Sequence, residues 1–191
     1  MIVFGFDPSL TTSGVAGLEY AGGHRAMNAR RVTAPAPAGA EHPIAEERRR
    51  MRRMLTGMLV GVPAQVDLSV VEGPAIAGKF RGKADERAGL RWMLIDQLLA
   101  RGPVAVVTPN TRELLAVGRG FARGTSQAVR KGAVLDRVRA TFPEVQIPDH
   151  NAADAVALAA AGAHALGMPM TYSAKQISAH AGIAWPVKVA G

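Results

Sequence analysis

Short apolar runs that stop at a carboxylate or at turn residues recur along the chain. Residues 2–6 stop at Asp7, residues 66–71 stop at Glu72, and residues 104–107 stop at a Thr-Pro pair. Short runs of β-branched and aromatic residues bounded in this way are typical of buried strands. The pattern therefore predicts three strands, two of which end in an acidic side chain.

Two further segments, residues 15–20 and 24–32, flank an Ala-Gly-Gly sequence. Small residues between two strand-like segments indicate a hairpin turn. Together with residues 2–6, these segments predict three antiparallel strands at the start of the chain.

Apolar residues recur at helical spacing in the segments between and after the later strands. The predicted helices begin near Pro43, Asp85, Asn110, Ser126 and Asn151. The helix over residues 85–101 has apolar side chains nearly all round, so we expect it to be buried on two sides. A second copy of the chain or a neighbouring helix would cover its outer side equally well.

Strands that alternate with helices after an antiparallel start predict an α/β domain with a mixed five-stranded sheet flanked by helices. We assign residues 1–166 to this domain. Residues 167–191 show no clear period and are expected to form a tail of unknown role.

The composition fits one folded domain, because the 191 residues are 48% hydrophobic and 20% charged. No apolar run approaches the roughly 20 residues of a membrane span, and the first residues lack the pattern of a signal peptide. The chain has no cysteine, which excludes disulfides, zinc-thiolate sites and thiol catalysis. We therefore expect a cytoplasmic protein, in a bacterium or a phage-infected host, that does not bind membranes.

Basic residues outnumber acidic ones by 23 to 15, giving a net charge of +8. This excess favours a nucleic acid as partner, although codon usage in a GC-rich genome would also raise the arginine content. The arginine run at residues 48–53 is interpreted chiefly as a solvated helix face. The candidate DNA-binding residues lie in two basic connections and one helix: Lys79, Phe80, Arg81, Lys83, Arg119, Arg123 and Lys131.

Three acidic residues stand in unusually apolar surroundings. Asp7 and Glu72 each end a predicted strand, and Asp154 lies among alanines early in a helix. Each one alone could be a turn or helix cap. Together, converging carboxylates need a cation, and hard oxygen ligands select Mg²⁺, with Mn²⁺ as a substitute. With a basic surface, the chemistry that this predicts is hydrolysis of a phosphodiester assisted by two metal ions.

The motifs resemble the RuvC family of Holliday-junction resolvases, which belongs to the RNase H-like superfamily. The matching pieces are residues 4–9 (FGFDPS) with Ser13-Gly14, residues 70–72 (VVE), residues 131–134 (KGAV) and residues 151–158 (NAADAVAL). The resemblance covers residues 1–166. It implies an RNase H-like fold in which Asp7, Glu72 and Asp154 are catalytic carboxylates that bind metal.

The resemblance also implies that Lys131 is a catalytic basic residue near the scissile phosphate, and that the loop after Glu72 contacts the branch point. The family usually has Asp or His three residues before the last acid, where this chain has Asn151. The amide oxygen of Asn151 can ligate Mg²⁺, but it brings no charge and cannot act as a base, so His150 and Asp149 are further candidate metal ligands. The family's aromatic residue soon after the second acid is also absent; Phe80 lies eight residues after Glu72.

We therefore expect an Mg²⁺-dependent endonuclease that cuts four-way and related branched DNA and works as a homodimer, with residues 90–99 as the interface. Its compact size also suits a phage-encoded enzyme. One alternative is a non-catalytic module that binds branched DNA, which Asn151 favours. Another is a phosphotransferase of the sugar-kinase and actin type, although the chain is short for two lobes and has no second Gly-rich loop.

Overall fold

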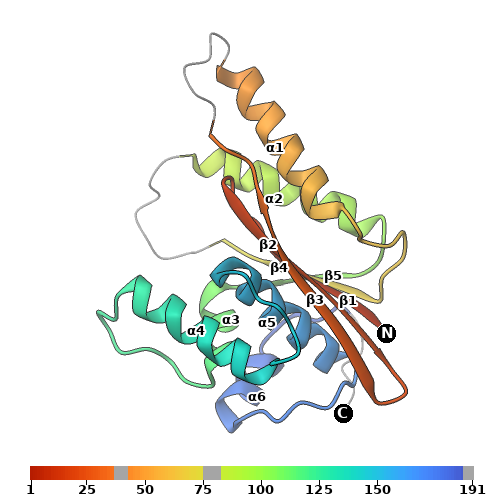
Figure 1. Ribbon diagram of the computed structural model, residues 1–191, viewed down its shortest axis with the longest axis vertical. Coiled ribbons are helices and arrows are strands. Elements are labelled where there is room, and N and C mark those ends of the chain that lie inside the picture. The colour runs from red at the N-terminus through yellow and green to blue at the C-terminus, as the bar shows by residue number, and fades with distance from the viewer. Residues whose placement is uncertain (37–42, 75–82, 187–191) are drawn as a thin grey trace.

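The computed structural model describes residues 1–36, 43–74 and 83–186 (Figure 1). Its centre is a five-stranded sheet with the strand order β3-β2-β1-β4-β5. The strands are β1 (Ile2–Asp7), β2 (Thr12–Ala21), β3 (His24–Thr33), β4 (Leu68–Glu72) and β5 (Val104–Val107).

The pairing of the strands confirms the predicted mixed sheet. β1 pairs with β2, and β2 with β3, in antiparallel register, whereas β4 is parallel to β1 and β5 is parallel to β4. Parallel neighbours need crossover connections, which α1 and α2 provide. Because β1 and β4 are parallel neighbours, their carboxyl ends meet at one edge of the sheet.

Helices cover both faces of the sheet, as Figure 1 shows. They are α1 (Pro43–Leu59), α2 (Ala84–Leu99), α3 (Pro109–Val117), α4 (Gln127–Thr141), α5 (His150–Ala165) and α6 (Ala174–Ala181). α1 and α2 lie on one face, and α5 packs directly on the other, with α3, α4 and α6 around it. The two faces bury separate hydrophobic clusters.

α5 lies unusually close to the sheet. A Cβ added at Gly5 would collide with the backbone oxygen of Ala155, and one added at Gly14 would collide with the backbone oxygen of Asn151. The helix is composed largely of alanine on every side, and nearly all of its residues are buried. Glycine on the strands and alanine on the helix together permit this backbone contact.

The segment after residue 166 is more ordered than its lack of periodicity suggests. Residues 174–181 form α6, whose capping box is made by Ser173 and Gln176. The Gln176 side chain is buried and donates from Nε2 to the backbone oxygen of Leu115 in α3 at 2.6 Å. Trp185 donates to the backbone oxygen of His180 at 3.1 Å. The lack of a clear period in residues 167–191 therefore did not reveal α6, and both the domain boundary at residue 166 and the tail of unknown role stay predictions.

The arginine run on α1 also needs a correction. Arg50 is only 2% exposed, so it does not belong to the solvated face. Its guanidinium donates to the backbone oxygen of Ala34 at 3.3 Å and pairs with Glu47 at 3.5 Å. Among the described residues, no helix is long and apolar enough to cross a membrane.

Candidate active site

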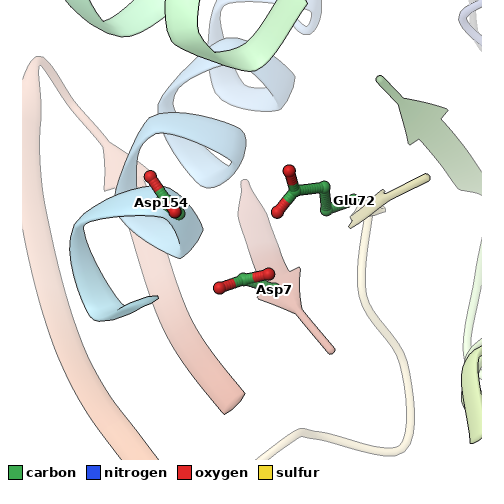
Figure 2. A group of neighbouring side chains, drawn as sticks. All are labelled: Asp7, Glu72 and Asp154. Atoms are coloured by element: carbon green, nitrogen blue, oxygen red, sulfur yellow. The ribbon is translucent and has the colours of Figure 1, made fainter. Parts of the chain in front are cut away.

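Three carboxylates meet where β1, β4 and α5 come together. Asp7 is the last residue of β1, Glu72 is the last residue of β4, and Asp154 lies in the second turn of α5. One oxygen from each lies within 4.8 Å of the others, and Figure 2 shows the three side chains converging on a common space. The structure therefore brings together the three acids that the sequence singles out.

Burial makes this cluster electrostatically unfavourable without a cation. Desolvation raises the pKa of Asp7 well above its usual value, and the charge of Glu72 and a hydrogen bond with it raise the pKa further. Desolvation is also the largest cause that raises the pKa of Asp154 to about 7, against the opposing effect of Arg112. A proton or a metal ion would relieve the repulsion between these groups.

The donor set fits a divalent metal ion. The three side chains offer hard oxygen atoms, they come from three different elements, and they are close enough to share one ligand sphere. Mg²⁺ and Mn²⁺ prefer such carboxylate oxygens.

Arg112 is a further member of this cluster, and the sequence interpretation missed it. It lies in α3, is 7% exposed, and donates from Nη2 to Oε1 of Glu72 at 3.1 Å. Its Nη1 donates to Oδ1 of Asp154 in a short ion pair. The only sequence signal was its spacing of three residues from Leu115, which is buried on the same side of α3.

Lys131 approaches the cluster from α4. It is half-buried, and its positive charge partly opposes the rise that desolvation causes in the pKa of Asp154 and adds to the lowering of the pKa of His150. For His150, desolvation is the larger cause. The charge of Lys131 thus acts on Asp154, while its place near the scissile phosphate and its catalytic role stay predictions.

No protein-family profile and no curated protein matches the chain. Among solved structures, that of Thermus thermophilus RuvC matches with a TM-score of 0.53 and 23% identity, over 83% of this chain and 91% of that one. The chain has the RuvC fold. This confirms the fold that the motifs imply, and it leaves the activity to be argued from the site.

Two DNA complexes are more distant matches, each with a TM-score of 0.49. One is T. thermophilus RuvC with a Holliday junction substrate, at 22% identity over 83% of this chain and 90% of that one. The other is a Fowlpox virus resolvase with substrate Holliday junction DNA, at 13% identity over 87% of this chain and 99% of that one.

The residues just before Asp154, the last acid of the RuvC-like motif, cap the start of α5 and pack it on the sheet. Asp149 is its N-cap, with Oδ1 accepting a hydrogen bond from the backbone nitrogen of Ala152 at 2.9 Å. The backbone of Asn151 packs against Gly14, and His150 is half-buried beside Lys131. Among the described acidic and histidine side chains, the converging group contains neither Asp149 nor His150. That Asp149, His150 or Asn151 binds metal stays a prediction.

The connection after Glu72 contains four candidate DNA-binding residues, of which Lys79, Phe80 and Arg81 lie outside the described residues. Lys83 is described and pairs with Glu47. It lines a cavity of about 410 Å³ together with Arg50, Arg87 and the β1–β2 turn at residues 8–11. The turn that lines this cavity follows Asp7 directly in the chain.

A second basic cavity, of about 350 Å³, lies between α3 and α4. Arg119 and Arg123 line it, as do Phe121 and Arg130. Arg130 pairs with Glu113 and stands 5.7 Å from the centre of the Phe121 ring. The structure therefore places the predicted residues Arg119 and Arg123 in a hollow whose wall also offers an aromatic ring.

Proposed function

We propose that the protein is a metal-dependent endonuclease that cuts branched DNA, and four-way junctions in particular. The observation that carries this proposal is the convergence of Asp7, Glu72 and Asp154 on a RuvC fold. Fold alone does not define an activity, but the motifs of the chain place these acids at the positions where the resemblance implies catalysis.

The acids are the proposed metal ligands, and Mg²⁺ is the proposed ion, with two ions per site and Mn²⁺ as a substitute. When bound, such ions supply an activated water and stabilise the departing 3′ oxygen. Lys131 would donate hydrogen bonds to a phosphate oxygen as charge builds up on the phosphate.

The two basic cavities are the proposed DNA contacts. Lys83 belongs to the cavity at the β1–β2 turn, and Arg119 and Arg123 belong to the cavity between α3 and α4. Arginine and lysine hold DNA chiefly through its phosphates. A branched substrate would pass both cavities, and Phe121 would provide a surface on which a base can stack.

The test is cleavage of a synthetic four-way junction by the purified protein, compared with a linear duplex of the same sequence. We expect paired nicks in the junction with Mg²⁺ or Mn²⁺, and none in EDTA. Junction binding without cleavage would favour the non-catalytic module, and turnover of added ATP would favour a phosphotransferase. Equal cutting of the duplex would contradict the preference for branched DNA.

Replacing Asp154 with Asn should lower the cleavage rate by about a thousandfold, because it removes a charged oxygen from the proposed metal site. Junction affinity, measured by gel shift in Ca²⁺, should stay close to that of the wild type. Asp136→Asn is the matched control, because Asp136 is an exposed acid on α4. Cleavage that survives in Asp154→Asn would disprove the site assignment.

A second candidate function, binding without cleavage, is favoured by one observation. Arg112 pairs with two of the three acids, so the cluster already contains a cation of its own. On this alternative the acids would support the fold, and the Asp154→Asn variant would bind junctions as the wild type does while neither protein cuts them.

We also propose that the protein is a homodimer, because symmetric cutting of a junction needs two sites. α2 is buried on one side only: Trp92 is 64% exposed and Leu99 is 60% exposed, and the two lie about two turns apart on the outer side of the helix. Two large apolar side chains exposed on one side of a helix support an interface there, because contiguous apolar surface marks sites of association.

The mass of the protein in solution, measured by light scattering, checks this proposal. We expect a dimer for the wild type and a monomer for Trp92→Glu, which should then nick junctions without pairing the two cuts. Val129→Glu is the matched control, since Val129 is an equally exposed apolar residue on α4. A monomeric wild type in the presence and absence of a junction would refute the dimer.

A further inference from the structure

Arg112 occupies the space on which the carboxylates converge. It binds one oxygen of Glu72 and one of Asp154, and its charge also acts on Asp7. Each carboxylate has only two oxygens, so this pairing uses half of the ligand atoms that Glu72 and Asp154 could offer to a metal. The guanidinium and a divalent ion therefore compete for the same oxygens.

The contacts of Arg112 differ from those of an arginine that is a fixed part of the fold. Among the described residues, its Nε is one of the few buried polar atoms that have no hydrogen-bond partner. Arg30 provides the contrast, because its guanidinium donates to three backbone oxygens, those of Gly57, Met58 and Val60. Backbone oxygens stay in place, whereas the partners of Arg112 are proposed metal ligands.

We propose that Arg112 is an internal cation that neutralises Glu72 and Asp154 in the metal-free protein and must release them when a divalent ion binds. The inference rests on the proposed metal-dependent function. It makes Arg112 a positioning residue that sets the affinity of the site for metal: pairing stabilises the empty site, and a metal ion binds only by replacing that pairing.

The direction of the effect distinguishes this role from a purely structural one. If Arg112 competes with metal, its removal leaves two buried carboxylates without a cation, so the metal-free protein loses stability and metal binding becomes tighter. If Arg112 instead holds the acids in place for the metal, its removal makes metal binding weaker. The two roles thus predict opposite changes in the dissociation constant.

The experiment measures Mn²⁺ binding by the electron paramagnetic resonance of the free ion, and Mg²⁺ binding by calorimetry, without DNA. Arg112→Gln should bind Mn²⁺ about tenfold more tightly than the wild type, the size of a typical coupling between neighbouring charges. Its melting temperature should be lower in EDTA and should rise more on addition of Mg²⁺. Arg112→Lys should give an intermediate affinity, because lysine keeps the charge but lacks the fork that bridges two carboxylates.

Arg25→Gln is the matched control, because Arg25 forms an ion pair with Glu144 that involves none of the three acids. It should bind Mn²⁺ as the wild type does. Unchanged or weaker binding by Arg112→Gln would overturn the inference while leaving the proposed metal site intact. If neither protein binds metal, both the inference and the proposed metal-dependent function fail.

A measurement on the wild type tests the same point without a substitution that could impair folding. Labelling the arginines with ¹⁵N makes the guanidinium protons of Arg112 observable by nuclear magnetic resonance. In EDTA, protons held by Glu72 and Asp154 should exchange slowly with water, and titration with Mg²⁺ should shift their signals and speed their exchange. Signals that stay unchanged while Mg²⁺ binds would overturn the inference.

Discussion

The two faces of the sheet are packed in different ways. On one face, α5 brings alanines against glycines of β1 and β2, so that helix and sheet meet backbone to backbone. On the other face, α1 and α2 fill the space with long side chains, among them Met54, Met58, Leu90 and Leu94. The first arrangement fixes the separation of the two layers, whereas the second leaves side chains that can adjust their rotamers.

This difference explains where the candidate site lies. Asp154 has a short side chain, so it reaches Asp7 and Glu72 only because α5 lies so close to the sheet. The face covered by α1 and α2 contributes its outer surface instead, with Trp92 and Leu99 exposed. The geometry of the carboxylate cluster therefore depends on small residues between α5 and the sheet, whereas the proposed dimer contact depends on large apolar residues of α2.

The largest effect is expected from Gly14→Ala on the α5 face. The new Cβ would collide with the backbone oxygen of Asn151, which no side-chain rotation can relieve. We expect a loss of about 3 kcal/mol in the free energy of unfolding, and weaker metal binding as α5 moves away with Asp154. Urea denaturation and Mn²⁺ titration measure the two effects.

Gly17→Ala is the control for that substitution, because it lies in the same strand but faces the other way. Its Cβ would stand 3.0 Å from ring atoms of Phe4, a side chain that can move. It should cost less than Gly14→Ala and leave metal binding unchanged. Equal losses from the two substitutions would mean that the faces do not differ as proposed.

The next largest effect is the change of stability with pH that Asp154, on α5, is expected to cause. The pKa of Asp154 is raised from 3.8 to about 7, mainly by burial, so the folded protein binds this proton more tightly than the unfolded chain does. In EDTA this contribution to stability is fully present below about pH 4 and is lost as the pH rises to about 7.

Asp154→Asn should remove this part of the pH dependence, so that the metal-free variant loses less stability between pH 5 and pH 8 than the wild type does. Thermal unfolding in EDTA between pH 5 and pH 8 measures it, with Asp136→Asn as the exposed control. Parallel curves for the wild type and Asp154→Asn would contradict the burial of an unfavourable charge.

The smallest effect is expected from Gly57→Ala, on the face covered by α1 and α2. Its Cβ would stand 2.5 Å from Cγ1 of Val32, a side chain on β3 that must shift. Alanine also favours the helix relative to glycine, so the two contributions offset one another within about 1 kcal/mol. Denaturation and junction cleavage should both resemble those of the wild type; a clear loss of cleavage would show that this face also positions the site.

Local patterns were enough to predict most of the elements and the three acids. Each acid is marked by the few residues around it: an apolar run precedes Asp7 and Glu72, and alanines surround Asp154. Ser126 caps α4 as expected, accepting a hydrogen bond from the backbone nitrogen of Val129 at 3.3 Å. Strand ends and helix caps are readable because their causes are local.

The features that were missed depend on contacts between distant segments. In the sequence, Arg112 and Arg50 look like ordinary surface arginines. Arg112 becomes buried because α3 packs beside β4 and α5, where it pairs with Glu72 and Asp154. Arg50 becomes buried because α1 packs over the end of β3, where it bonds to Ala34. Residues 174–181 form only two turns of helix, which the buried side chain of Gln176 ties to α3. Helices this short are held by tertiary packing more than by their own propensity.

The sequence by itself determined the order of the strands and of the first five helices, the two strands that end in a carboxylate, and the excess of basic residues, because these follow from neighbouring residues and from composition. Only the tertiary structure decided that Asp7, Glu72 and Asp154 share one space and that Arg112 enters it. The physical reason is that these four residues are far apart in the sequence, on β1, β4, α3 and α5. Their side chains meet only because glycine and alanine allow α5 to pack closely on the sheet.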